Sequence, residues 1–142
     1  MTTNNYKAVE PQELPAQSFE WGATKWLVAP GITPGANISF GEVALLPGRG
    51  HDRHNHPDSE EILYVLSGEG LQMVGDEAPF PVHAGDTIYV PIGVFHSTRN
   101  TGWGPLRLLA IYNPGGPEKD LEGLPDFREV APGEAAGWSL SS

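Results

Sequence analysis

Imidazole nitrogens are common ligands of transition metals, and four of the five histidines of the chain lie in two short clusters. In the first cluster, His54 and His56 are two residues apart. Side chains at this spacing on an extended strand point to the same face, so the two imidazoles could hold one metal ion. A turn through residues 57–59 can bring Glu61 back alongside the pair. The segment therefore predicts part of a metal site.

The second cluster, residues 85–100, predicts a strand, a Pro-x-Gly turn and a returning strand. The turn places His96 at the start of the returning strand, from which it could reach the same interior as a third imidazole. Three neutral imidazoles and one carboxylate suit iron, manganese, nickel, copper, cobalt or zinc. Such a set leaves one or two coordination positions for water or substrate.

Two further histidines are expected outside this site. His51 precedes His54 by three residues, and on an extended chain that spacing places it on the opposite face. We expect a surface histidine there. His83 has no partner nearby in the sequence, which favours an exposed or hydrogen-bonded side chain.

Several arginines and aromatic residues could contact a substrate. An arginine can bind a substrate carboxylate through paired hydrogen bonds, although surface arginines and arginines in salt bridges are more common. Aromatic residues could line the mouth of a barrel, although on short strands they more often belong to the core. The residues in question are Arg49, Arg53, Arg99, Arg107, Trp26, Phe40, Tyr89, Phe95, Trp103 and Tyr112.

Short β-prone runs, each closed by Gly or Pro, must position these groups. The chain holds 18 Gly and 14 Pro, and no stretch of its middle region has apolar helical spacing over four turns, so we expect helix only near the ends. Strands at roughly ten-residue spacing imply a sandwich or a barrel. The runs are Lys25 to Ala29, Ala36 to Leu46, Ile62 to Leu66, Gly70 to Val74, Thr87 to Val90, Phe95 to Asn100, and Leu106 to Tyr112.

The two ends of the chain lack this pattern. At 142 residues one domain is expected, and we place it at residues 21–114. Residues 1–20 are polar and without periodicity, which indicates an N-terminal arm. Residues 115–142 are rich in Gly and Pro and predict a tail packed on or extending from the barrel. An ordered lid, a dimer contact and a partly disordered end all remain open for this tail.

Composition excludes several classes of protein. There is no cysteine, so disulfide scaffolds, thiolate zinc sites and cysteine nucleophiles are excluded. The net charge of −10 would repel nucleic-acid phosphates and anionic membranes, so we expect neither as a partner. No apolar run is long enough for a signal peptide or a membrane span, which favours a cytoplasmic protein.

Both histidine clusters resemble, without a gap, the two motifs of the cupin superfamily. The first motif is Gly, five residues, His-x-His, three or four residues, Glu, six residues and Gly. The second is Gly, five residues, Pro-x-Gly, two residues, His, three residues and Asn. The matching positions are Gly48, His54, His56, Glu61 and Gly68, then Gly85, Pro91, Gly93, His96 and Asn100.

The resemblance implies an all-β protein, an antiparallel jelly-roll β-barrel that holds one divalent transition metal per chain and pairs as a homodimer. It implies ligation by His54, His56, Glu61 and His96. Glu60 also satisfies the looser spacing, but only Glu61 has the required distance to Gly68, and strand parity turns Glu60 to the other face. Iron and manganese are the first choices of metal, and zinc, nickel, cobalt and copper are the alternatives.

The expected function is that of a metal-dependent enzyme acting on an oxygen-rich small molecule. Dioxygenase-type oxidation stands slightly ahead of non-redox chemistry, which includes isomerase, decarboxylase, lyase and cyclase reactions. Glu61 is the candidate catalytic residue, because it could leave the metal transiently and act as a base. The opposing class is a ligand-binding or sensing module without turnover, since one fold can host many functions.

Overall fold

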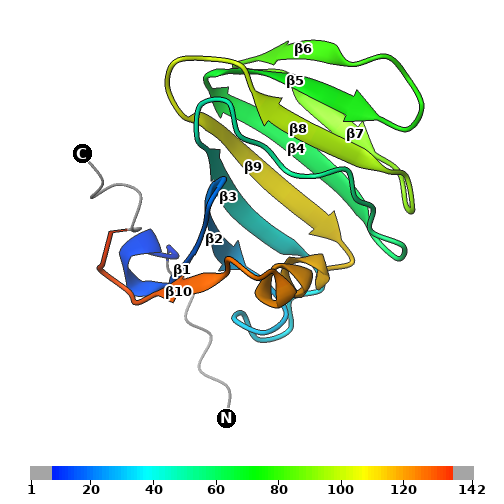
Figure 1. Cartoon of the computed structure of the whole chain (residues 1–142). Coiled ribbons are helices and arrows are strands. Elements are labelled where there is room, and N and C mark those ends of the chain that lie inside the picture. The colour runs from blue at the N-terminus through cyan, green and yellow to red at the C-terminus, as the bar shows by residue number, and fades with distance from the viewer. Residues whose placement is uncertain (1–7, 136–142) are drawn as a thin grey trace.

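Ten strands in two antiparallel sheets form the protein in a computed structural model that describes residues 8–135 (Figure 1). The larger sheet has the order β10-β1-β2-β3-β9-β4-β7, and the smaller one the order β6-β5-β8. The strands of the larger sheet are β1 (Ala16–Phe19), β2 (Gly22–Val28), β3 (Ser39–Leu45), β4 (Glu60–Ser67), β7 (Thr87–Val90), β9 (Leu106–Asn113) and β10 (Arg128–Val130). Those of the smaller sheet are β5 (Glu69–Val74), β6 (Phe80–His83) and β8 (His96–Asn100).

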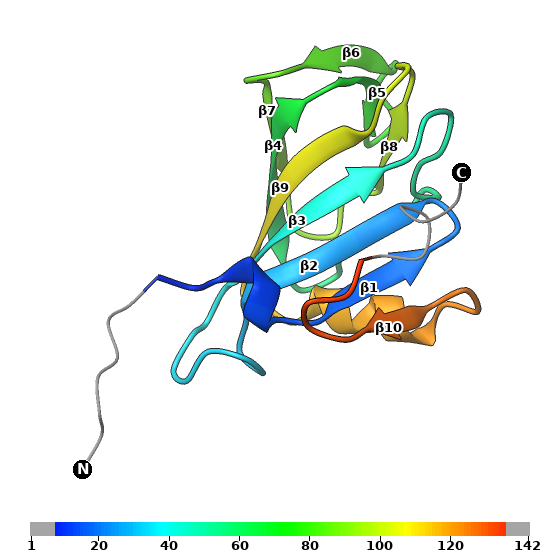
Figure 2. The ribbon, with the colours of Figure 1, turned by 90° about the vertical axis from the view of Figure 1, so that its left-hand side faces the viewer.

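The hydrophobic core lies between the two sheets, which face each other across the open roll in Figure 2. Residues alternate between buried and less buried along the central strands β3 and β9, as a period of two requires. The register pairs Val43 with Leu108 and Leu45 with Leu106, so the inward side chains of neighbouring strands pack against one another. The fold is the expected jelly-roll type, but the two sheets do not close into a complete barrel.

Most of the expected strands are present, and helix is confined to the ends as predicted. The described residues contain two 3-10 helices, η1 (Pro11–Glu13) and η2 (Pro117–Gly123). Three short strands, β1, β6 and β10, were not expected from the sequence. β1 and β10 have four and three residues and β6 contains Pro81, so none shows a clear alternating pattern.

The two ends of the chain meet at one edge of the larger sheet. β1 lies in the expected N-terminal arm, where it pairs with β2 on one side and with β10 on the other. The tail packs back on the sheet through Glu118, which is buried and accepts hydrogen bonds from Ser39 Oγ at 2.7 Å and Gly116 N at 3.0 Å. The tail therefore packs on the fold through η2 and β10. The expected tail and arm also include residues 136–142 and 1–7, which lie outside the described residues.

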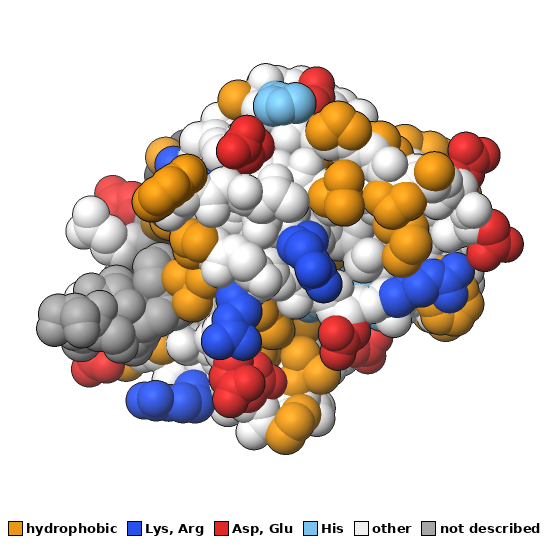
Figure 3. All heavy atoms as spheres, turned by 45° about the horizontal axis from the view of Figure 1, so that its top comes forward, with side chains coloured by type: hydrophobic (Ala, Val, Ile, Leu, Met, Phe, Trp, Pro, Cys, Tyr) orange, Lys and Arg blue, Asp and Glu red, His pale blue; other side chains and the backbone are white. Residues whose placement is uncertain are grey.

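The outer surface combines apolar side chains with scattered charges. Figure 3 shows hydrophobic side chains among separate acidic and basic ones on the face that carries the smaller sheet. Exposed apolar residues of this sheet include Leu71 and Phe80. Among residues 8–135, neither helix is long and apolar enough to cross a membrane. The expected homodimer and the cytoplasmic location stay predictions.

Candidate metal centre

The first histidine cluster runs antiparallel to β8 and extends the smaller sheet. His54 and His96 face each other in this pairing, with His54 N donating to His96 O at 3.1 Å and His96 N donating to His54 O at 2.8 Å. The two histidine clusters of the sequence are therefore joined by backbone hydrogen bonds. Gly50 allows the close approach, because a Cβ atom there would lie 2.2 Å from the Thr98 carbonyl oxygen.

His51 lies in the same cavity as His54, so the prediction of a surface histidine on the opposite face is wrong. Gly50 pairs with Arg99 and His54 pairs with His96, which gives the histidine segment one residue more than β8 between the two pairs. Such a bulge shifts the alternation of side chains by one position. The His51 ring packs against Trp21, with centroids 4.1 Å apart, and lies 5.1 Å from the His54 ring.

Glu61 enters the same interior from β4, as strand parity predicted. Its side chain is buried, as are those of Leu63 and Val65 on the same face of the strand. Glu60 points outward and accepts hydrogen bonds from Tyr89 Oη and Asn113 Nδ2, both at 2.8 Å. His83 is also on the surface, where it lies 3.8 Å from Asp86.

Three histidines and one carboxylate converge at the inner end of the cavity. Within the described residues, His54, His56 and His96 form a group whose ligand atoms all lie within 4.8 Å of one another. The Glu61 Oε1 atom is 2.8 Å from His96 Nε2 and 3.7 Å from His56 Nε2. The structure thus brings together the four side chains that the sequence selected. Their ligation of a metal stays a prediction.

The hydrogen bonds of the histidine rings orient their free nitrogens toward one point. His96 Nδ1 lies 3.0 Å from the Val94 carbonyl oxygen and His54 Nδ1 lies 2.7 Å from that of Asp52. A carbonyl accepts a proton from Nδ1, so Nε2 of each neutral ring carries a lone pair. Metal-binding histidines are commonly oriented by such carbonyls.

The lone pairs of buried ring nitrogens and of Glu61 Oε1 have no hydrogen-bond donor. His96 Nε2 and Glu61 Oε1 would face each other as two acceptors, and both are buried without a hydrogen-bond partner, as are the two ring nitrogens of His56. Two acceptors 2.8 Å apart repel unless a proton or a metal ion lies between them. Ligand atoms at right angles on one ion are about 3 Å apart when each lies at roughly 2.1 Å from it. The residues present therefore fit a divalent metal.

Burial keeps most of these rings neutral, which metal binding requires. Burial lowers the pKa of His56 to about 4 and that of His51 to about 3, and it also lowers the pKa of His54. Burial alone would lower the pKa of His96, but the adjacent Glu61 carboxylate raises it overall. Burial and the Glu61 charge raise the pKa of Tyr112 well above 10, so this phenol keeps its proton.

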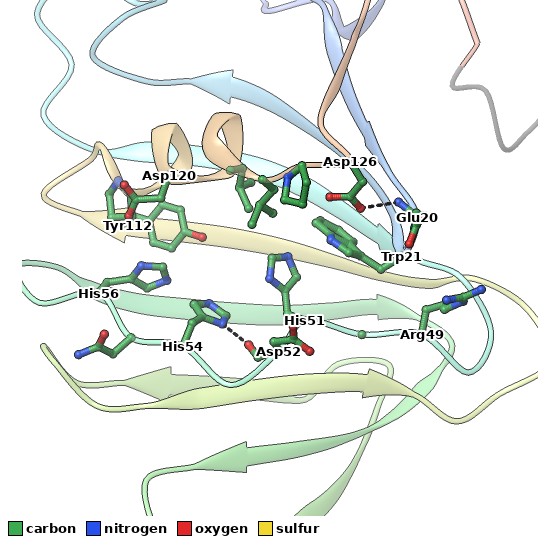
Figure 4. A pocket seen from close by; sticks show the side chains of 16 residues that line it. Glu20, Trp21, Arg49, His51, Asp52, His54, His56, Tyr112, Asp120 and Asp126 are labelled. Carbon is green, nitrogen blue, oxygen red and sulfur yellow. Dashed lines mark hydrogen bonds between the residues drawn. The ribbon is translucent and has the colours of Figure 1, made fainter.

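A cavity of about 630 Å³ opens above the histidines (Figure 4). Its floor consists of the histidine segment from Arg49 to His56, together with Glu61 and His96, which line a small inner cavity of about 40 Å³ next to it. The opposite wall comes from the two ends of the chain and is largely apolar. Its residues are Trp21, Pro117, Leu121, Leu124 and Pro125. The cavity also carries four carboxylates, those of Glu20, Asp52, Asp120 and Asp126, against the single arginine Arg49.

The comparison with known protein families decides the class of the chain. The cupin domain family matches residues 41–112, about half of the sequence. The chain belongs to the cupin family. The matched region contains the histidine segment, β4 and β8, so it includes all four converging side chains.

Two curated relatives of this cupin come from Streptomyces. Protein SchB of Streptomyces halstedii is 34% identical over 122 residues, which cover 85% of this chain and 87% of SchB. Polyketide synthase CurC of Streptomyces cyaneus is 31% identical over 116 residues, which cover 81% of this chain and 74% of CurC. Among solved structures, a predicted oxalate decarboxylase from Thermotoga maritima has a TM-score of 0.65 at 27% identity, covering 76% of this cupin and 99% of that chain.

The roles of the arginines and aromatic residues follow from the structure. Of the four arginines considered, Arg49 lines the cavity, whereas Arg107 donates to Glu42 at 2.6 Å, Arg53 packs over Phe95 and Arg99 is exposed on β8. Of the six aromatic residues, Tyr112 lines the cavity, Trp26 is core, Phe40 is half-buried on β3, and Tyr89, Phe95 and Trp103 are exposed.

Sequence reasoning missed the apolar wall of the cavity. Trp21, Leu121 and Leu124 are single apolar residues in segments without periodicity, and none stood out as a binding residue. The isolated apolar residues of the tail, such as Leu121 and Leu124, could have indicated that the tail packs against another part of the protein.

Proposed function

We propose that this cupin is a metal-dependent enzyme that closes a carbon ring in a neutral, oxygen-rich substrate of the polyketide type. The observation that carries the proposal is the buried set of donors at the floor of a large cavity with an apolar wall. His54, His56, Glu61 and His96 would hold one divalent metal. When bound, this ion supplies a Lewis acid for the carbonyl oxygens of a substrate.

The size of the cavity supports a substrate with several carbon atoms. Ligand pockets of roughly 300–1,000 Å³ hold molecules the size of a drug, and this one has about 630 Å³. Oxalate would fill a small part of it and would leave the apolar wall without a contact. A ring or a long carbon chain can bury Trp21, Leu121 and Leu124.

The charges around the cavity support a neutral substrate. Four carboxylates line it and one arginine opposes them. A dianion such as oxalate would be repelled at this entrance, because charges of like sign raise the free energy of binding. A polyketone has no net charge and avoids that cost. Among the relatives, the name of CurC points to the same class of substrate.

The side chains of the chain itself suit the proton transfers of ring closure. The attacking carbon must lose one proton and a ring carbon next to the attacked one must lose a second, and the attacked carbonyl oxygen takes up both protons and leaves as water. Glu61 Oε1 is the carboxylate oxygen nearest to the histidines, and we expect it to accept the proton from carbon. The apolar wall would exclude bulk water from the reacting atoms.

Oxidation by dioxygen is the second candidate, because three neutral imidazoles and one carboxylate also suit iron(II). The two reactions differ in what they consume. Ring closure joins two carbons and releases one water without using dioxygen. Oxidation consumes dioxygen, and a binding module returns its ligand unchanged.

The test uses 1-phenylhexane-1,3,5-trione, whose phenyl group can rest on the apolar wall. Loss of one water converts it to 5-phenylresorcinol. Protein purified without chelator or affinity nickel is analysed for metal and incubated with the triketone, with product followed by chromatography and dioxygen by an electrode. We expect 5-phenylresorcinol without dioxygen uptake, and no product from a His54→Ala, His56→Ala double variant. Dioxygen uptake would favour oxidation, and unchanged triketone that binds would favour a binding module.

A further inference from the structure

Tyr112 on β9 lies directly beside the candidate metal centre without belonging to the group of histidines. The sheet register pairs Tyr112 with Glu61 on the neighbouring strand β4. Side chains directly opposite each other on antiparallel strands emerge on the same face and lie side by side. The phenol ring therefore enters the interior next to the Glu61 carboxylate.

Two aromatic contacts hold the Tyr112 ring in place. Its centroid lies 5.4 Å from that of Trp26 on β2 and 4.8 Å from that of His56, the second contact being edge to face. Only 7% of the residue is exposed. A ring packed on both sides keeps one orientation, so the position of its hydroxyl group is defined before any ligand binds.

The hydroxyl group of Tyr112 reaches the space where a substrate would lie. In Figure 4 it points into the cavity above the histidines. Tyr112 lines this outer cavity and also a small inner one of about 40 Å³ that it shares with Glu61 and His96. Together with His51 and His54, which also line both cavities, it connects the outer cavity to the metal-binding floor.

The other described tyrosines differ from Tyr112 in every one of these respects. Tyr64 and Tyr89 are 41% and 54% exposed on the outside of the larger sheet. The hydroxyl group of Tyr89 already donates to Glu60. The hydroxyl group of Tyr112 instead lies within reach of the buried Glu61 carboxylate at the candidate metal centre. A phenol keeps its proton at neutral pH, so this hydroxyl group can turn from Glu61 to a substrate oxygen and donate to it.

We infer that Tyr112 is a catalytic residue that donates a hydrogen bond to the carbonyl oxygen under attack, an inference that rests on the proposed ring closure. Negative charge develops on this oxygen as the new carbon–carbon bond forms. A preorganised donor aimed at such an oxygen stabilises the transition state more than the bound substrate. Tyr112 remains protonated throughout, and the oxygen leaves with the water of the reaction.

The experiment compares Tyr112→Phe with Tyr64→Phe, which removes the same oxygen atom from the outer surface. Both variants and the wild type are assayed with 1-phenylhexane-1,3,5-trione and titrated with 1,8-dihydroxyanthraquinone, whose absorption reports binding without turnover. Metal content and melting temperature are measured on the same samples. Phe keeps the ring that packs on Trp26, so the fold should be retained.

We expect Tyr112→Phe to lower kcat by about 100-fold, the effect of removing one donor to a developing oxyanion. KM and the dissociation constant of the quinone should rise only about fivefold, as for one neutral hydrogen bond. Metal content should equal that of the wild type, and Tyr64→Phe should match the wild type throughout.

Two results would overturn the inference while the proposed function stands. One is a Tyr112→Phe protein with the kcat and the quinone affinity of the wild type. The other is a loss of kcat that follows a loss of metal, which would make Tyr112 a positioning residue for Glu61. If the wild type binds the quinone but closes no ring, the proposed reaction is wrong. In that case, weaker quinone binding by Tyr112→Phe would still support Tyr112 as a hydrogen-bond donor to the ligand. A wild type inactive toward both probes rejects both proposals.

Discussion

The floor and the wall of the cavity are built in different ways. The floor is made by His54, His56, Glu61 and His96, which lie within 43 positions of the sequence and are connected by the pairing of the histidine segment with β8. The wall is made by Trp21 from one end of the chain and by η2 from the other. The difference separates two tasks. Local pairing defines the donors of the chemistry, and the meeting of the two chain ends defines the space left for a substrate.

Removal of a histidine from the floor should have the largest effect. We expect His96→Ala to lower metal affinity by more than about 100-fold, because even residues that only orient a ligand contribute 10- to 100-fold. Elemental analysis after dialysis measures this loss. His83→Ala, at the exposed histidine, is the control and should keep the metal. Equal metal content in both variants would mean that the floor does not hold the ion.

Weakening the pairing between the histidine segment and β8 should have the next largest effect. In Gly50→Ala the added Cβ atom would meet the Thr98 carbonyl oxygen at 2.2 Å, so the histidine segment must move away from β8. We expect a lower melting temperature and a loss of metal affinity of about tenfold or more. Gly104→Ala is the matched control, because nothing lies within 4 Å of a Cβ atom there. Calorimetry and metal titration of both variants would show whether the pairing positions the donors.

A change in the wall should leave the floor intact. Glu118→Ala removes the carboxylate that accepts hydrogen bonds from Ser39 and Gly116 and thereby holds η2 against the sheet. We expect a loss of about 1–3 kcal/mol of stability. The affinity for 1,8-dihydroxyanthraquinone should fall, with metal content unchanged. The exposed Glu122→Ala should behave as the wild type in denaturation and binding curves. A parallel loss of metal in Glu118→Ala would contradict the separation of the two tasks.

Lowering the pH should have the smallest of these effects, and it should reduce stability through the buried histidines of the floor. The pKa of His56 is about 4 and that of His51 is about 3 in the folded protein, against 6.5 for free histidine. The unfolded chain therefore binds protons at these sites first, and the free energy of unfolding of the metal-free protein falls as the pH drops from 6.5 toward 4. The raised pKa of His96 contributes with the opposite sign.

The melting temperature of chelator-treated protein measures this effect. We expect the melting temperature to decrease steadily over this pH range, because the unfolded chain takes up more protons than the folded one. The slope should be smaller in His56→Gln, which has no proton to bind at that position. An unchanged melting temperature from pH 6.5 to pH 4 would show that the histidines are not neutral in the fold.

The sequence predicted the floor because its signals are local. The parity of His54 and His56, the turn before Glu61 and the Pro-x-Gly turn before His96 each involve a few neighbouring residues. The facing of His51 could not be predicted, because it depends on a bulge that forms only when the segment pairs with β8. The assumption that side chains alternate strictly along a strand therefore placed His51 on the wrong face.

The wall could not be predicted for a different reason. Trp21 and Leu121 are about 100 residues apart, and each is an isolated apolar residue among polar ones. Both line the cavity of the folded protein, where β1 pairs with β10. Strands of three or four residues, such as these two, carry too little alternation to be recognised. The central strands of the jelly roll were recognised because they are longer and regularly alternating.

The pairing of β1 with β10 also imposes an order in time. A ribosome makes His96 32 residues before it makes Arg128, the first residue of β10. At about 5–20 residues per second this interval lasts roughly 2 to 6 s. All four candidate ligands are therefore synthesised before β10, the strand through which the two chain ends pair at the edge of the larger sheet. The donors of the floor are thus complete in the chain before its two ends can pair.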